Sequence, residues 1–186
     1  GCIMTAVVTV NPLPAAITGT AAVCVGLTTN LTDATAGGTW SSSNLGLATV
    51  GTSSGIVTGL SDGALIITYT LPTGCIMTRI ATVNPLPSAI TGTMNVCAGL
   101  TTTLANTGGG TWSSGNTAVA TVNSTTGVVT GVVAGTATIT YTLPTGCITT
   151  AVVLVNPLPA AIVGLNNVCF GLTTSVTNPT PFGMWS

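Results

Sequence analysis

A pattern with a period of about 72 residues runs through this chain of 186 residues. The segment "VNPLP" begins at Val10, Val83 and Val155, so its copies lie 73 and 72 residues apart. The single deletion lies between Cys97 and Trp112, where the second copy is one residue shorter than the first. A period of this length is typical of tandem arrays in which each repeat folds as one unit.

The period divides the chain into four parts. We expect residues 1–10 to be the last strand of a preceding unit, 11–83 and 84–155 to be two complete domains, and 156–186 to be the first strands of a further, truncated unit. A sheet cut in its middle would expose an unpaired apolar edge. We therefore expect this chain to be a segment of a longer array.

Within one repeat the apolar residues follow the period of a β-strand. In residues 135–142, Ala137, Ile139 and Tyr141 alternate with threonines, which predicts a strand with one buried face. Residues 118–122 and 127–132 form two further short β patterns, and 147–156 a longer, more apolar one. About seven short strands in about 72 residues, separated by Gly, Asn and Pro, predict an all-β fold of small sandwiches.

The near absence of ionisable side chains excludes several function classes. The chain has one basic residue (Arg79), two acidic ones (Asp33 and Asp62) and no histidine. General acid–base catalysis needs titratable groups near their working pH, and nucleic-acid binding needs a basic surface. Calcium needs several oxygen ligands together, so we interpret Asp33 and Asp62 as solvated loop carboxylates. We expect no enzyme activity, no cofactor, no metal and no nucleic-acid partner.

The surface composition predicts self-association. No apolar run approaches the roughly 18 to 20 residues that a membrane helix requires, so we expect no membrane span in this chain. The net charge is −1, and surfaces with little charge tend to associate. The expected partners are therefore other copies or neighbouring repeats.

Several spaced motifs carry a family resemblance. "GGTWSSSNLGLATVGTSSGIVTGLSDGALIITYT" at 37–70 and "GGTWSSGNTAVATVNSTTGVVTGVVAGTATITYT" at 109–142 share a W-S-S-x-N, A-T-V, G-x-V-T-G series. In this order the motifs resemble the bacterial immunoglobulin-like group 2 domain. The "VCxG", "GC" and "VNPLP" elements resemble the versions in large secreted surface proteins and adhesins of Bacteroidota. The resemblance implies tandem Ig-like domains at the bacterial cell surface.

Two functions fit this resemblance. The leading hypothesis is a structural segment that forms a stiff stalk or a self-associating extracellular fibre, with an adhesion or matrix role. The alternative is a recognition module that binds a glycan or host protein through loops at a sandwich end. An exposed aromatic cluster present in one repeat alone would favour recognition, and Phe170 and Phe182, in the truncated unit, come closest to one.

The repeated aromatic and proline residues have structural interpretations. One tryptophan per repeat at a constant strand position indicates core, as in Ig-like sandwiches, and a sugar-stacking role is the weaker reading. The predicted core aromatics are Trp40, Trp112, Trp185, Tyr69 and Tyr141. Proline ends a strand and stiffens the passage to the next domain. The predicted joint residues are Pro12, Pro14, Pro85, Pro87, Pro157 and Pro159.

The phrase "TLPTGCI" at 70–76 and 142–148 is predicted to be a hairpin that ends in a cysteine. A sorting signal would read L-P-x-T-G and stand before a hydrophobic tail. In a hairpin, Pro72 or Pro144 takes the second turn position, and Gly74 or Gly146 supplies the positive φ that closes the turn.

Six cysteines and no histidine favour disulfides in an oxidising compartment over a mixed zinc site or free thiols. Pairing inside each repeat would join Cys24 to Cys75 and Cys97 to Cys147, but the Ig-like topology implied by the resemblance puts the two cysteines of a repeat at opposite ends of the sandwich. We therefore favour a bridge from Cys24 to Cys147 across the joint. Cys75 and Cys97 would then pair with other domains, while links between chains stay open, as do the partners of Cys2 and Cys169.

Overall fold

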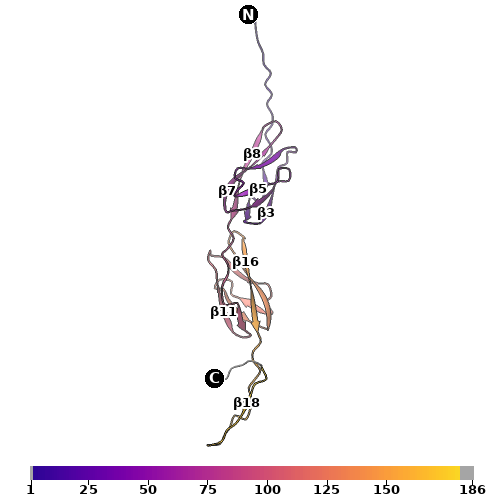
Figure 1. Cartoon of the computed structure of the whole chain (residues 1–186). Coiled ribbons are helices and arrows are strands. Elements are labelled where there is room, and N and C mark those ends of the chain that lie inside the picture. The colour runs from indigo at the N-terminus through magenta and orange to yellow at the C-terminus, as the bar shows by residue number, and fades with distance from the viewer. Residues whose placement is uncertain (1, 181–186) are drawn as a thin grey trace. The chain divides into compact units, whose positions relative to one another are not determined.

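The computed structural model describes residues 2–180, which form strands and loops without any helix (Figure 1). The all-β prediction is therefore confirmed. By contacts the chain divides into two compact units, the first made of Gly1–Pro87 with Thr142–Ile148 and the second of Ser88–Tyr141 with Thr149–Ser186. The short Thr142–Ile148 loop thus packs with the first unit although the chain on both of its sides belongs to the second.

The first unit consists of two four-stranded sheets. One sheet has the order β1 (Thr18–Gly19), β3 (Thr28–Thr32), β6 (Ile56–Gly59) and β5 (Ala48–Val50). The other has the order β2 (Ala22–Cys24), β8 (Ile76–Asn84), β7 (Gly63–Thr70) and β4 (Thr39–Ser42). β2 pairs with β8 in parallel, and the remaining pairs are antiparallel.

The second unit repeats this arrangement. Its sheets have the orders β13 (Ala120–Val122), β14 (Val128–Gly131), β11 (Thr101–Ala105), β9 (Thr91–Gly92), and β10 (Asn95–Cys97), β16 (Ile148–Asn156), β15 (Gly135–Thr142), β12 (Thr111–Ser114). Again the one parallel pair described is the one between β10 and β16. Each repeat therefore has one strand more than the seven expected, because the first predicted strand divides between the two sheets.

The period-two pattern of the sequence sets the core. Along β7, Leu65, Ile67 and Tyr69 are buried while Ile66 between them is exposed. β15 repeats this alternation, with the predicted residues Ala137, Ile139 and Tyr141 buried. Apolar side chains on alternate positions thus fill the space between the sheets, and this burial is the main favourable contribution to folding.

The segments outside the two sandwiches are less regular. Residues 2–10, where the last strand of a preceding unit is expected, form no strand and are exposed. In a complete repeat this strand lies between two neighbours, as β8 lies between β2 and β7, and residues 2–10 have no such neighbours in the part of the chain described. In the predicted truncated unit, β17 (Val163–Gly164) pairs with β18 (Val176–Thr177).

Candidate functional site

The two "TLPTGC" segments form the same hairpin loop. After β7, the Leu71 N–H donates to Cys75 O at 2.9 Å and the Gly74 N–H donates to Leu71 O at 2.9 Å. Gly74 has φ +84°, a left-handed conformation that favours glycine. Residues 143–147 repeat both hydrogen bonds, with Gly146 at φ +86°. The structure thus has a turn closed by glycine at both places where a hairpin is predicted.

A disulfide joins Cys24 to Cys147, the pair that the sequence analysis favoured, with 5.7 Å between the Cα atoms. Cys24 is the last residue of β2, where it pairs with Asn84 at the end of β8. Cys147 ends the hairpin loop, and its Sγ lies 4.0 Å from Asn84 O. Cys24 is 9% exposed and Cys147 is 1% exposed, so the bond is shielded from solvent.

The alternative bridge from Cys24 to Cys75 does not fit this fold. Cys24 lies beside Asn84 at one end of β8, and Cys75 immediately precedes Ile76 at the other end. β8 has nine residues, which at about 3.3 Å per residue place the two cysteines more than 20 Å apart. A disulfide tolerates about 7 Å between Cα atoms.

The other four cysteines are free thiols in the structure. Cys2 and Cys169 are exposed, whereas Cys75 and Cys97 are half-buried. Cys75 Sγ lies 3.7 Å from Asn11 O, much as Cys147 Sγ lies beside Asn84 O. Cys97 ends β10, in register with Asn156 of β16.

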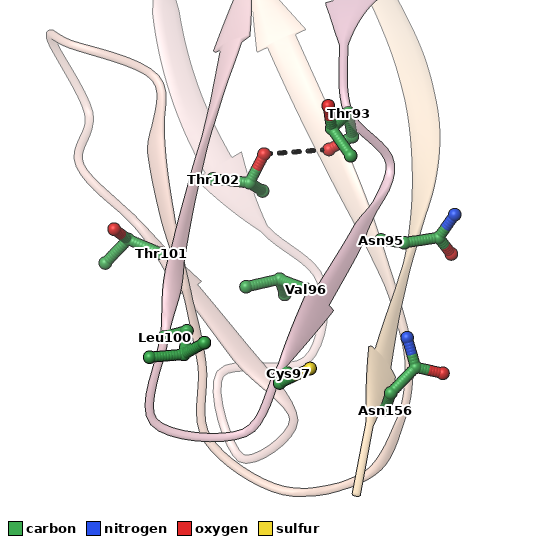
Figure 2. Close-up of a pocket in the computed structure, with 8 residues that line it drawn as sticks. All are labelled: Thr93, Asn95, Val96, Cys97, Leu100, Thr101, Thr102 and Asn156. Carbon is green, nitrogen blue, oxygen red and sulfur yellow. Dashed lines mark hydrogen bonds between the residues drawn. The ribbon is translucent and has the colours of Figure 1, made fainter. Parts of the chain in front are cut away.

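A pocket of about 450 Å³ surrounds Cys97 and was not anticipated from the sequence. Figure 2 shows Cys97 at the end of its strand, with Asn156 on the neighbouring strand. Thr102 and Leu100 line the opposite side, and the Thr102 Oγ1–H donates to Thr93 O at 3.0 Å. The thiol is thus part of a formed concave surface inside the second unit.

The predicted core aromatics that the structure describes are all buried. The ring centroids of Trp40 and Tyr69 lie 4.7 Å apart, and those of Trp112 and Tyr141 are also 4.7 Å apart. Trp185 and Phe182 lie outside the described residues. Trp40 and Trp112 are each 6% exposed, which favours the core reading over stacking on a sugar.

The tyrosine hydroxyls are held by loop backbone. Tyr69 Oη donates to Thr35 O at 2.6 Å and accepts a hydrogen bond from the Gly38 N–H at 2.9 Å. Tyr141 Oη accepts one from the Gly110 N–H at 2.6 Å. Each tyrosine therefore fixes the loop that enters the tryptophan strand.

The proline joints directly follow β8 and β16, which end at Asn84 and Asn156. Pro14 is buried and Pro87 half-buried. The other joint prolines are exposed: Pro12, Pro85, Pro157 and Pro159. Proline has no N–H to donate, so the ladder of each last strand stops where the joint begins.

The charged residues do not gather into a site. Both predicted loop carboxylates lie in loops; Asp62 is exposed, whereas Asp33 is less solvated than expected. Asp33 is half-buried because its Oδ1 accepts a hydrogen bond from the Thr35 N–H at 2.7 Å, which closes an Asx turn. Arg79 Nη1, on β8, donates to the carbonyl of Ile17, the residue just before β1, at 2.7 Å, a contact that was not foreseen.

Residues 2–180 contain no group of three or more His, Cys, Asp or Glu side chains placed to hold a metal ion. Over the same range there is no helix that is long and apolar enough to cross a membrane. The exposed aromatic residue in this range is Phe170, which stands without a second exposed aromatic. The described surface therefore offers no aromatic cluster of the kind that would favour the recognition hypothesis.

The family model of the bacterial Ig-like domain (group 2) matches residues 78–153. No curated protein matches the chain. Among solved structures, the C-terminal 282-residue fragment of intimin, in complex with the intimin-binding domain of its translocated receptor, is similar at 17% identity and TM-score 0.46, over 82% of this chain and 67% of that one.

Two further likenesses are lower. Domains 4 and 5 of the S-layer protein SbsC are 24% identical with a TM-score of 0.31, over 70% of this chain and 82% of that one. Mouse cadherin-23 EC22–24 is 14% identical with a TM-score of 0.33, over 78% and 65%. At TM-scores below 0.5 these likenesses carry no argument about function. The family match and the repeated sandwich show that this chain is built of tandem Ig-like domains, with residues 78–153 matching the bacterial Ig-like domain (group 2).

Proposed function

We propose that this chain is a structural segment of a secreted bacterial cell-surface protein, in which tandem Ig-like domains transmit force as a stiff stalk or extracellular fibre with an adhesion or matrix role. The observation that carries the proposal is the disulfide from Cys24 to Cys147. Such a role needs no catalysis, and the chain offers no nucleophile with a neighbouring base.

The disulfide supports a mechanical role through its position in the chain. Its loop, Thr142–Ile148, is flanked on both sides by residues of the second unit, Tyr141 and Thr149. The bond therefore closes a covalent ring in addition to the polypeptide joint after β8. The two cysteines are 123 residues apart in sequence, so the ring encloses most of both sandwiches. Tension applied to the chain ends passes through the sulfur atoms and leaves the enclosed strands unloaded.

The disulfide also supports an extracellular location. Disulfides persist in oxidising compartments such as the periplasm, the cell surface and the secreted space, and are rare where glutathione keeps thiols reduced. The bacterial family that residues 78–153 match agrees with a cell-surface protein of this kind.

The outer sheet faces support self-association. Ile76 and Ile80 on β8, and Ile148 and Val152 on β16, are exposed. A soluble surface normally separates such residues with charges of both signs, but this chain carries a net charge of −1 with three charged side chains in all. Light scattering at rising concentration should show association that Ile80→Lys with Val152→Lys reduces. A wild-type chain that stays a monodisperse monomer would contradict the fibre part of the proposal.

The mechanical part of the proposal is tested by stretching single molecules from their two ends. While the disulfide is intact, the 123-residue segment between the cysteines cannot extend. Reduction should lengthen the fully extended molecule by about 400 Å, at roughly 3.3–3.6 Å per residue. The Cys24→Ser variant should show the long extension without reductant.

The matched control is Cys97→Ser, which replaces the corresponding cysteine of the second repeat and should extend like the wild type. An equal extension of the wild-type chain with and without reductant would overturn the mechanical proposal, because tension would then pass through the folded strands.

A further inference from the structure

We propose that the pocket around Cys97 receives the hairpin loop of residues 71–75 from a second copy of this chain, and that a disulfide forms between Cys97 and the Cys75 of that copy. This inference rests on the proposed structural function and names the partner of one of its surfaces. It is carried by the comparison of Cys97 with Cys24, whose hairpin partner is present in the structure.

The backbone around Cys97 is the backbone that holds Cys24 in its disulfide. The Leu27 N–H donates to Cys24 O at 3.0 Å, and the Leu100 N–H donates to Cys97 O at 3.0 Å. Each cysteine also pairs in parallel register with the last residue of its sheet neighbour, Cys24 with Asn84 and Cys97 with Asn156. The main chain that presents the thiol is therefore the same in both repeats.

The next backbone contacts agree as well. The Val25 N–H donates to Asn84 O at 3.0 Å, and the Ala98 N–H donates to Asn156 O at 2.9 Å. The Thr102 Oγ1–H on the rim of the pocket donates to Thr93 O (Figure 2). In the first repeat the equivalent Thr29 Oγ1–H donates to Thr20 O at 2.8 Å. No rearrangement of the second unit is needed to present Cys97 as Cys24 is presented.

The two sites differ in whether a hairpin loop packs on the cysteine. In the first unit the Cys147 loop packs on the cysteine, and Cys24 and Cys147 are both buried. Cys97 is a free, half-buried thiol facing a pocket of about 450 Å³. Free cysteines belong to the most buried residue types, so a loop with a thiol of its own is the cover that this pocket fits.

The chain itself carries such a loop. Residues 70–76 and 142–148 have the identical sequence "TLPTGCI". The two loops have the same closing hydrogen bonds, from the Leu71 N–H to Cys75 O and from the Leu143 N–H to Cys147 O, both at 2.9 Å. Cys75 is free and half-buried, so its thiol is available to a partner. The loop at 70–76 thus has the same sequence and turn as the loop at 142–148, which Cys24 binds, and can contact Cys97 in the same way.

The chemistry is a thiol–disulfide exchange with a low-molecular-weight disulfide as oxidant. The Cys75 thiolate attacks the small disulfide, which forms a mixed disulfide and releases one small thiol. The Cys97 thiolate of the first copy then attacks the Cys75 sulfur of the second copy and releases the other small thiol. One S–S bond is formed between the two copies, and the S–S bond of the small disulfide is broken. The small disulfide is thereby reduced to two thiols, which carry the two protons lost by Cys75 and Cys97.

The pocket and the loop are different surfaces, so the contact is heterologous. Heterologous contacts that do not close into a ring produce open chains. The inferred product is therefore an open covalent chain of copies, each joined to the next from Cys97 to Cys75.

The test uses the full chain in which the exposed Cys2 and Cys169 are replaced by serine. Incubation with oxidised and reduced glutathione should give a ladder on a non-reducing gel, and mass spectrometry should find Cys75 linked to Cys97 at least tenfold more often than either cysteine linked to its own kind. Adding Cys75→Ser or Cys97→Ser should abolish the ladder. A mixture of these two variants should give a dimer and nothing larger, because each copy then retains one half of the joint.

A statistical mixture of Cys75–Cys75, Cys97–Cys97 and Cys75–Cys97 links would overturn the inference, since it would show thiol collision without docking. A ladder that survives either substitution, or no ladder at all, would overturn it equally. The stretching experiment depends on the Cys24–Cys147 bond alone, so an absent ladder with a normal effect of reductant on extension would remove this inference and leave the proposed function standing.

Discussion

The two repeats have the same strand order and the same core, yet they differ in three contacts. Cys24 is bonded and buried whereas Cys97 is free and half-buried. The Tyr69 hydroxyl has two backbone partners and that of Tyr141 has one. Arg79 has a backbone partner, Ile17 O, and the corresponding position of the second repeat is Ala151. The repeated residues set the fold, and the two repeats differ in which of these residues have a partner.

The largest predicted effect is one that both repeats share. Trp40→Ala and Trp112→Ala each remove a buried ring that packs on a tyrosine, and each should lower the free energy of unfolding of its own repeat by about 3–5 kcal/mol. Guanidinium denaturation followed by circular dichroism measures both. Phe170→Ala, at an exposed position, serves as the control. A loss in one repeat without a comparable loss in the other would break the equivalence of the two cores.

The second prediction separates the repeats. Replacing Cys24 and Cys147 by serine should lower the stability of the chain by about 2–4 kcal/mol, because the cross-link restricts the unfolded state. The same change at Cys97, a free thiol, should stay within about 0.5 kcal/mol of the wild type. Thermal unfolding without reductant provides the comparison. Equal effects of the two changes would show that the repeats do not differ in cysteine state.

The third prediction concerns the tyrosine hydroxyls. Tyr69→Phe leaves the Gly38 N–H and Thr35 O without their partner and should cost about 1–2 kcal/mol. Tyr141→Phe removes one bond, to the Gly110 N–H, and should cost about 1 kcal/mol. Urea denaturation of the two variants measures both losses in the free energy of unfolding. A larger loss for Tyr141→Phe than for Tyr69→Phe would contradict this difference in the number of hydrogen bonds.

The smallest prediction is for Arg79. Its guanidinium donates to Ile17 O at the side of the first sandwich and is half-buried, so Arg79→Ala should cost about 1 kcal/mol or less. Ala151→Arg, the reciprocal change in the second repeat, should stabilise that repeat if its guanidinium reaches the equivalent carbonyl. Thr78→Ala, at the exposed neighbouring position, is the control for both. A loss above about 3 kcal/mol for Arg79→Ala would mean that the residue has a further partner.

Local patterns in the sequence predict the parts of the structure that depend on neighbouring residues. The alternation in residues 135–142 predicts β15 and its buried face, and the Pro and Gly of "TLPTG" predict the turn that ends at Gly74 or Gly146. These patterns do not predict that the first strand of each repeat divides into two, as into β1 and β2. The spacing of apolar residues does not show with which sheet a residue pairs.

Contacts between distant residues were harder to predict. The Tyr69 hydroxyl bonds to loop residues 31 and 34 positions away, and no local pattern marks that pair. The pocket at Cys97 requires β10, β11 and β16 to be placed together. The Cys24–Cys147 pair could be favoured in advance only through the strand directions of an Ig-like topology, which separate Cys24 from Cys75.

Trypsin digestion tests whether Cys24 is bonded to Cys147. Arg79 is the single Lys or Arg in the chain, so tryptic cleavage yields fragments 1–79 and 80–186, with Cys24 in the first and Cys147 in the second. The chain is digested in denaturant without reductant, after Cys2, Cys75, Cys97 and Cys169 are replaced by serine.

We expect the two fragments to migrate together until a reductant is added and then to separate. Fragments that separate before reduction would contradict the Cys24–Cys147 bond.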